Sequence, residues 1–182
     1  MLAVLGDGTR PIYDRLGDFL TLAEAAQELL EQEELEALAA LDLTQVQRRT
    51  PEPGPGLFPG GLIFLKTLEQ LEEDWGALLD QAAQTQLPPR QDHQLQRVAE
   101  YTAFRYLLKC VNDGDLLGRA QLCVFLTLAA ERIGAVIGIP EALRRLSCEI
   151  EHSDDNLEAL LEAFWTHDGL SLENCLRHVC EE

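Results

Sequence analysis

Between Leu116 and Ile139 the chain has its longest apolar run, and any fold must provide a place to bury it. The length would suit a membrane span, but Arg119, Gln121, Glu131 and Arg132 interrupt the run. A charged side chain at the centre of a bilayer costs about 2.5 to 3.5 kcal/mol on insertion scales. Two arginines and a glutamate therefore favour a helix in the core of a protein over a membrane helix.

The rest of the chain shows the periodicity of helices. From about Pro11 to Gln32, apolar residues recur at steps of three and four, which places them on one buried face. No segment alternates apolar and polar residues over more than a few positions, so no strand is predicted. Further helices are predicted over residues 33–48, 62–84, 91–111, 116–138, 140–151 and 154–166, with a short last helix after residue 171.

Two of the predicted helices have well-defined apolar faces. In the helix over 62–84, the residues expected to point inward are Leu65, Leu68, Leu71, Trp75 and Leu78. In the helix over 91–111 they are Leu95, Val98, Tyr101, Phe104 and Leu108. Both faces are expected to contribute to the core.

Several helix ends can be placed from single residues. Thr9 is a candidate N-cap for the first long helix, and Ser153 is a candidate N-cap for the helix over residues 154–166. Gly114 can adopt the left-handed conformation that ends a helix, and Asp115 can then cap the next one. We expect a sharp stop and restart of the chain at this point, because the two signals are adjacent.

A surface loop is predicted over residues 49–61, where prolines at positions 51, 53, 55 and 59 forbid a continuing helix. Its glycines lack the spacing of a nucleotide-binding loop, and the prolines remove backbone N–H donors. Short connections elsewhere favour antiparallel neighbours. The sequence therefore predicts one all-α domain over residues 1–182, a bundle of about seven to eight mostly antiparallel helices.

The net charge of −18 bears on possible partners. Such a field repels phosphate backbones and anionic lipids, so neither nucleic acid nor a membrane is expected as a partner. Five glutamates lie between Glu28 and Glu36. This acidic stretch could attract a basic or lysine-bearing protein, or it could simply be a solvated helix face.

The five cysteines are widely spaced, and no signal peptide is recognised at the start of the chain, which favours reduced thiols in a cytoplasmic protein. Cys175 and His178 share a helix face, and His167 precedes them, so three potential zinc ligands lie near one another in sequence. No CxxC motif occurs, and a frayed terminal helix is the favoured interpretation. No metal site is predicted.

Two polar residues have a setting that could support chemistry. His152 follows Glu149 and Glu151, so a carboxylate could orient it as a general base, although a hydrogen bond that fixes the helix junction is the favoured interpretation. Arg105 lies among aromatic residues and needs a carboxylate, for which Glu149, Glu151 and Asp113 are candidates. The partnership would form either an internal salt bridge or an anion-binding pocket. Arg105, Asp113, Glu149, Glu151 and His152 therefore make up the candidate polar cluster.

Three segments together resemble the C-terminal region of the flagellin lysine-N-methylase family. They are Tyr101-x-x-Phe104-Arg105-Tyr106-Leu107-Leu108, then Asp113-Gly114-Asp115-Leu116-Leu117, and Glu149-Ile150-Glu151-His152-Ser153-Asp154-x-Asn156-Leu157. The start of the chain, Leu2 to Leu5 with Arg15-Leu16 and the helix to Leu30, is similar to the preceding part of that region. The resemblance touches most of the chain and is patchy between about Glu31 and Arg90.

The resemblance implies a bacterial protein that takes part in methyl transfer from S-adenosylmethionine to lysine side chains of flagellin. Members of the family also carry an N-terminal cysteine-rich segment that binds an iron–sulfur cluster, and this sequence has none. We therefore expect a scaffold or substrate-binding module, with no cofactor held by this chain, in place of an independent catalyst. No catalytic residue is carried over from the family.

Two alternatives stay open beside this interpretation. One is a non-catalytic, acidic helical protein-interaction module, which an exposed apolar groove would favour. The other is a free-standing hydrolase or metal enzyme, which would need a pocket into which His152, Arg105 and a glutamate converge.

Overall fold

A computed structural model of the chain describes residues 1–42, 44 and 46–180, in which the regular secondary structure is helical and no strand is present. The helices are α1 (Leu2–Gly6), α2 (Ile12–Glu31), α3 (Leu35–Ala40), α4 (Gly60–Leu65), α5 (Trp75–Gln84), α6 (Asp92–Tyr106), α7 (Cys110–Asp113), α8 (Leu116–Ile137), α9 (Ile139–Leu146), α10 (Asp154–Thr166) and α11 (Leu172–Cys180). The segments outnumber the seven to eight helices expected, because α1, α3, α4 and α7 have six residues or fewer. The predicted all-α fold is confirmed.

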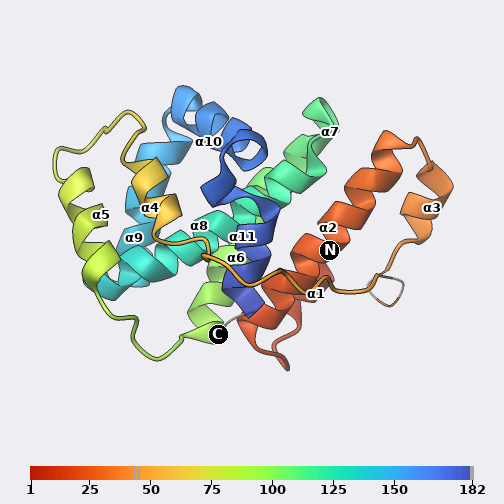
Figure 1. Cartoon of the computed structure of the whole chain (residues 1–182), viewed down its shortest axis with the longest axis horizontal. Coiled ribbons are helices and arrows are strands. Elements are labelled where there is room, and N and C mark those ends of the chain that lie inside the picture. Colours follow the sequence, from red (N-terminus) through yellow and green to blue (C-terminus); the bar gives the residue numbers. More distant parts are fainter. Residues whose placement is uncertain (43, 45, 181–182) are drawn as a thin grey trace.

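The apolar helix α8 lies at the centre of the fold (Figure 1). It contacts α2, α5, α6, α9, α10 and α11, which surround it. Phe125, Leu122 and Val124 in its middle have no exposed surface. Among the described residues, α8 alone has the length and hydropathy of a membrane span, and most of it is buried inside the protein. The expectation that this run forms the core helix is confirmed.

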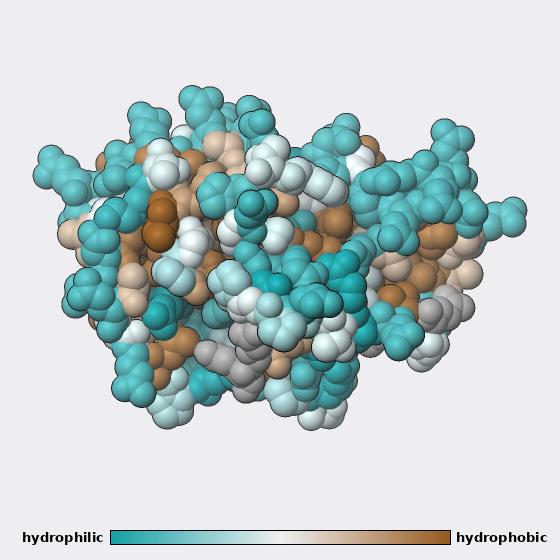
Figure 2. Space-filling view, viewed as in Figure 1, coloured by the Kyte–Doolittle hydropathy of each residue, from teal (hydrophilic) through white to brown (hydrophobic). Residues whose placement is uncertain are grey.

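The outer surface is largely hydrophilic. On the face shown in Figure 2, hydrophilic residues predominate around the edge, and the hydrophobic patches between them are small and separate. At one side of the molecule, α3 and the end of α2 project away from the other helices (Figure 1). The predicted helix over 33–48 is present only as α3, and residues 43 and 45 of that range lie outside the described residues.

The predicted helix over 62–84 is wrong, because the chain forms α4 and α5 with a nonhelical linker over residues 66–74 between them. Leu65 and Trp75 are buried as expected, but 46% of Leu71 is exposed. In the linker, buried side chains of a distant segment bind the backbone N–H groups of Glu69 and Leu71. These tertiary hydrogen bonds replace the bonds of a continuous helix.

The predicted inward face of the helix over 91–111 is also partly wrong. Leu95 and Val98 are buried, but 75% of Phe104 and 67% of Leu108 are exposed. The helix α6 ends at Tyr106, and a 3-10 turn at Leu107–Lys109 leads into α7. The buried residues in the second half of α6 are Ala99, Thr102, Ala103 and Tyr106, and the Thr102 hydroxyl lies 3.4 Å from the Cys123 carbonyl on α8. Small residues permit close approach of two helices, and α6 packs against α8.

The predicted stops and starts are confirmed except at the first long helix. Gly114 has φ +75° and ends α7, and Asp115 Oδ1 accepts a hydrogen bond of 2.8 Å from the Gly118 N–H at the start of α8. Ser153 caps α10 in the same way. Thr9 does not cap α2, because its N–H and hydroxyl both donate to Asp7 and α2 begins after Pro11.

Candidate functional site

Arg105 and Glu151 from the candidate polar cluster meet as an internal ion pair. The Arg105 Nε bonds the Glu151 carboxylate, whose side chain is only 4% exposed. The Tyr101 hydroxyl donates to the same carboxylate over 3.3 Å. Burial and the negative charge of Glu151 raise the pKa of Tyr101, so the phenol stays a donor at neutral pH. These contacts join α6 to the π-helical turn Ser147–Glu151 that follows α9.

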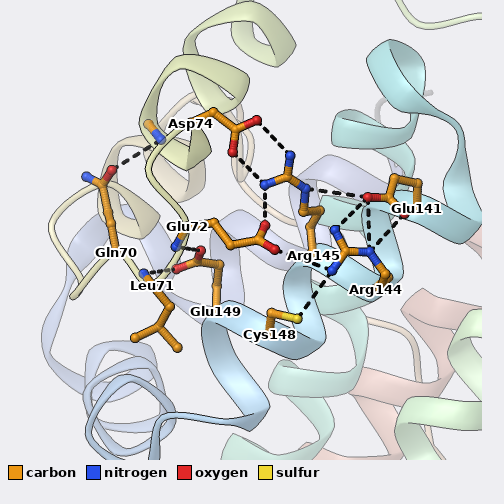
Figure 3. Close-up of polar contacts among 10 residues, drawn as sticks. Gln70, Leu71, Glu72, Asp74, Glu141, Arg144, Arg145, Cys148 and Glu149 are labelled. Atoms are coloured by element: carbon orange, nitrogen blue, oxygen red, sulfur yellow. Dashed lines mark hydrogen bonds and ion pairs between the residues drawn. The ribbon is translucent and has the colours of Figure 1, made fainter.

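Glu149 points to the opposite side of that turn, toward the linker between α4 and α5 (Figure 3). Its carboxylate is buried and accepts hydrogen bonds from the N–H groups of Leu71, over 2.9 Å, and Glu72, over 2.8 Å. Asn156 adds a second attachment, because its amide exchanges hydrogen bonds with the backbone N–H and C=O of Glu69. Glu149 therefore has a structural role in fixing the linker.

Arginines of α9 hold the same linker from the outside (Figure 3). The two terminal nitrogens of Arg145 donate to the two oxygens of Asp74, over 2.6 and 2.7 Å. Arg145 also bonds Glu72, and Arg144 pairs with Glu72 and Glu141. The hydrogen bond from Arg145 lowers the pKa of Asp74. We call Glu149, Asn156, Arg144 and Arg145, with the linker groups they bind, the linker clamp.

The two other residues of the candidate polar cluster lie apart from these contacts. Asp113 pairs with Arg119 on α8, with an Nε–Oδ2 distance of 3.1 Å. His152 is exposed at the end of the π-helical turn, where its backbone N–H donates to the Ser147 carbonyl. The five residues of the cluster therefore do not converge on one pocket.

The three potential zinc ligands are each engaged in local packing. Cys175 is fully buried, which raises the pKa of its thiol to about 12, and the thiol donates to the Leu170 carbonyl. The His167 Nδ1 accepts a hydrogen bond from the Gly169 N–H, and the His178 ring packs edge-on against Phe58. Within the part of the chain that the structure describes, no three His, Cys, Asp or Glu side chains are placed to hold a metal ion.

An apolar stripe on the outer side of α6 and α7 is the feature of the surface that sequence reasoning missed. It consists of Tyr101, Phe104, Leu108 and Val111, of which 39%, 75%, 67% and 83% is exposed. We call these four residues the α6 stripe. Tyr101 and Phe104 lie on α6, Leu108 lies in the 3-10 turn Leu107–Lys109, and Val111 lies on α7, so the four residues follow one another over three helical segments. Exposed large apolar side chains that gather on one surface are typical of an interaction site.

A shallow apolar groove continues the α6 stripe toward the start of α6. It has a volume of about 330 Å³ and lies between α6 and α9. Gln94, Arg97 and Val98 line it on α6, and Ile139, Pro140 and Leu143 are on the opposite wall. Residues 98, 97 and 94 are three, four and seven positions before Tyr101, so they lie on the same side of the helix.

Two hollows of about 550 and 490 Å³ lie beside residues 46–50, where Arg48 and Arg49 line both of them. Arg48 bonds Asp14 over 3.4 Å, and Arg49 bonds Glu24 over 3.2 Å. These arginines are therefore already neutralised by carboxylates of the protein, and they attach the loop to α2.

Comparison with protein-family models, with curated proteins and with solved structures finds no match for this chain. Its function is therefore to be inferred from its own geometry.

Proposed function

We propose that this chain is a non-catalytic helical protein-interaction module and that the α6 stripe is its binding face. The observation that carries the proposal is the exposure of Phe104, Leu108 and Val111, each more than 60% exposed, at the end of α6 and in the two short helical segments that follow it. Burial of a large apolar side chain contributes about 1.5 to 3 kcal/mol. A partner that covers several such side chains would therefore bind with a favourable free energy.

The support beneath the α6 stripe suits binding. Ala99, Thr102 and Ala103 on α6 are buried, and α6 packs against the core helix α8. A rigid face loses little conformational entropy when a partner covers it, so more of the gain from apolar burial becomes affinity. The candidate polar residues, by contrast, are taken up by internal contacts: Glu151 with Arg105, and Glu149 with the linker.

Site-specific photo-crosslinking tests this proposal. A photoreactive phenylalanine analogue is placed at position 104 in cells that naturally express the protein, and at position 63 as a control, because Ile63 on α4 is 62% exposed. We expect a discrete adduct of higher mass from position 104 and none from position 63. Equal yields at the two positions, or no adduct at either, would contradict a binding face at the α6 stripe.

A second candidate function has one observation in its favour. The segments that resemble the flagellin lysine-N-methylase family, around residues 101–108 and 149–157, meet in space through the Arg105–Glu151 ion pair and the Tyr101 hydrogen bond. We infer that, in this case, the chain would be a cytoplasmic scaffold that receives a lysine-bearing, flagellin-like protein. The acidic face formed by Glu28, Glu31 and the residues that follow would suit such a partner.

The cysteines do not suit an iron–sulfur cluster, because Cys123 and Cys175 are buried on different helices and no three ligands meet among the described residues. Isothermal titration of the purified chain with S-adenosylmethionine tests the rest. Heat with one-to-one stoichiometry would favour the methylase-like function, whereas a flat trace would leave any methyl-transfer chemistry outside this chain.

A further inference from the structure

We propose that residues 48–56 form a strap that opens from α11 and α2 as a unit, and that ionic strength sets how often it is open. Figure 1 shows this segment, which we call the α11 strap, crossing α11 on its way to α4. In the closed form the α11 strap covers Arg177, which is only 7% exposed. The inference does not depend on the α6 stripe.

Two side chains of α11 hold the main chain of the α11 strap. Arg177 donates from Nε to the Glu52 carbonyl over 2.6 Å and from Nη1 to the Pro55 carbonyl over 2.7 Å. The Glu173 Oε1 accepts a hydrogen bond of 2.8 Å from the Glu52 N–H. A Cβ at Gly54 would lie 2.9 Å from the Arg177 Cζ, so the glycine gives the guanidinium room against the strap. The attachment to α11 is therefore made by hydrogen bonds.

Ion pairs of two arginines hold the beginning of the α11 strap. Arg48 lies 3.4 Å from Asp14 on α2, and Arg49 lies 3.2 Å from Glu24 on α2 and also pairs with Glu173 on α11. The five side chains are between 25% and 46% exposed. Salt screens pairs of this kind, because the Debye length falls from about 10 Å at 0.1 M to about 3 Å at 1 M.

The α11 strap has no apolar anchor of its own. None of the residues 48–56 is buried. The next residue, Leu57, has no exposed surface, and Phe58 packs against Phe125 and His178. These apolar contacts hold the chain at the end about which the strap would hinge. Detachment of residues 48–56 exposes little apolar surface, and segments of this kind open locally at a low free energy.

The groups that the α11 strap would leave behind keep other partners. Asp18, which lies 3.9 Å from Arg48, also bonds Arg10 over 2.6 Å. Arg177 keeps Glu173, 3.7 Å away on its own helix. Opening therefore leaves neither of these charges without a partner of opposite sign. The open form presents the Arg177 guanidinium to a carboxylate or carbonyl group of another molecule, and the closed form hides it.

Hydrogen exchange of the Glu52 N–H, followed by nuclear magnetic resonance on the whole chain, tests the opening. The rate is compared at about 0.05 M and about 1 M NaCl, and a synthetic peptide of residues 46–59 corrects for the intrinsic exchange rate. We expect exchange at least about fivefold faster at the higher salt, because the exposed ion pairs are screened, with the amides of α8 protected at both. A rate that salt does not change, or one equal to that of α8, would overturn the inference.

The variant Arg49→Gln tests the role of the ion pairs. We expect it to raise the exchange rate of the Glu52 N–H at low salt by at least about threefold and to reduce the effect of added salt, because two of the pairs are lost. The matched control is Arg97→Gln on α6, whose side chain is 70% exposed and which should leave the rate unchanged. Circular dichroism checks that both variants are folded. The same rate in Arg49→Gln and in the natural chain would contradict the ionic control.

Labelling with phenylglyoxal, a reagent selective for arginine, tests what the opening uncovers. Mass spectrometry of the digested chain reports the labelling of Arg177, with the exposed Arg97 as the control in the same sample. We expect the labelling rate of Arg177, relative to Arg97, to rise with salt by about the same factor as the exchange of the Glu52 N–H. An Arg177 that stays unlabelled at about 1 M NaCl while that amide exchanges faster would overturn the inference that the α11 strap hides this side chain.

Discussion

Glu149 shows how one buried carboxylate can set the path of a distant segment. It lies 77 and 78 positions from Glu72 and Leu71 in the chain, yet it accepts hydrogen bonds from both of their backbone N–H groups. Without it, two donors in a nonhelical linker would lose their partner. Sequence reasoning singled out Glu149 as a possible partner of Arg105 or His152, because nothing in the sequence indicates that it meets the backbone of residues 71 and 72.

We expect Glu149→Gln to lower the free energy of unfolding by about 1 to 3 kcal/mol. The amide keeps one acceptor oxygen, but it turns a donor toward the N–H of Leu71 or Glu72 and leaves a buried group unpaired. Urea unfolding of the variant measures the loss. The matched control is Glu158→Gln on the exposed face of α10, which should change the value by less than about 0.5 kcal/mol. Equal losses in the two variants would rule out the proposed role of Glu149.

Gly114 is required by backbone conformation alone. Its φ of +75° disfavours any side chain, while a Cβ built there would meet no atom within 4 Å. We therefore expect Gly114→Ala to cost about 1 kcal/mol of stability through backbone strain. Gly8→Ala is the control, because the added Cβ would meet Gln96 at an ordinary 3.7 Å without a left-handed φ. A neutral Gly114→Ala variant in thermal unfolding would show that α7 can end without this conformation.

At the scale of helices, prediction succeeded where local signals decided the outcome. The bounds of α8 and α10 followed from Asp115, Ser153 and the apolar periodicity, and the structure confirms both. Prediction failed where long-range contacts overrode local preference. The periodicity of residues 62–84 suits a helix, but Glu149 and Asn156 bind the linker within it and separate α4 from α5.

The prediction of which face of α6 is buried was partly wrong for a related reason. Periodicity shows that a helix has an apolar face, but α6 has two sets of residues that could pack inward. Ala99, Thr102 and Ala103 are buried together with Leu95 and Val98, whereas Phe104 is exposed and Leu108 lies beyond the end of α6 in the 3-10 turn. The assumption that the larger apolar side chains are buried was therefore right for Leu95 and Val98 and wrong for Phe104 and Leu108. The pairing of Arg105 with Glu151 was among the predicted partnerships, and the ion pair is present.

The linker clamp makes the stability of the fold depend on pH, through the ion pair between Asp74 and Arg145. Asp74 has a lowered pKa because of its hydrogen bond to Arg145. A carboxylate of this kind stabilises the fold at any pH above its unfolded pKa of about 3.9, and the contribution is lost as the pH falls through the lower folded value. We expect the natural chain to be more stable than Asp74→Asn at pH 7, with the difference vanishing below about pH 4. Urea unfolding across this range measures it, and a difference that persists at pH 2 would contradict the assignment.

At the scale of the whole molecule, a strongly acidic protein presents a stripe of exposed apolar side chains. The acidic end formed by α3 and the end of α2 and the α6 stripe are different surfaces, and they suit different partners. The predicted basic partner, the single-domain organisation and the antiparallel packing of the helices stay predictions. The exposed apolar stripe is the feature that favours a protein-binding module over a helical domain without a binding face.

The measurement that bears most directly on this account is the stability of a Phe104→Ser and Leu108→Ser double variant. It is made by urea unfolding at a concentration low enough to keep the chain monomeric, with Phe125→Ser in the core of α8 as the comparison. If the α6 stripe is free surface held for a partner, the double variant should lose less than about 0.5 kcal/mol, whereas Phe125→Ser should lose about 3 to 5 kcal/mol or fail to fold. A loss of several kcal/mol in the double variant would mean that these side chains belong to the core of the chain itself, and would contradict the proposed binding face.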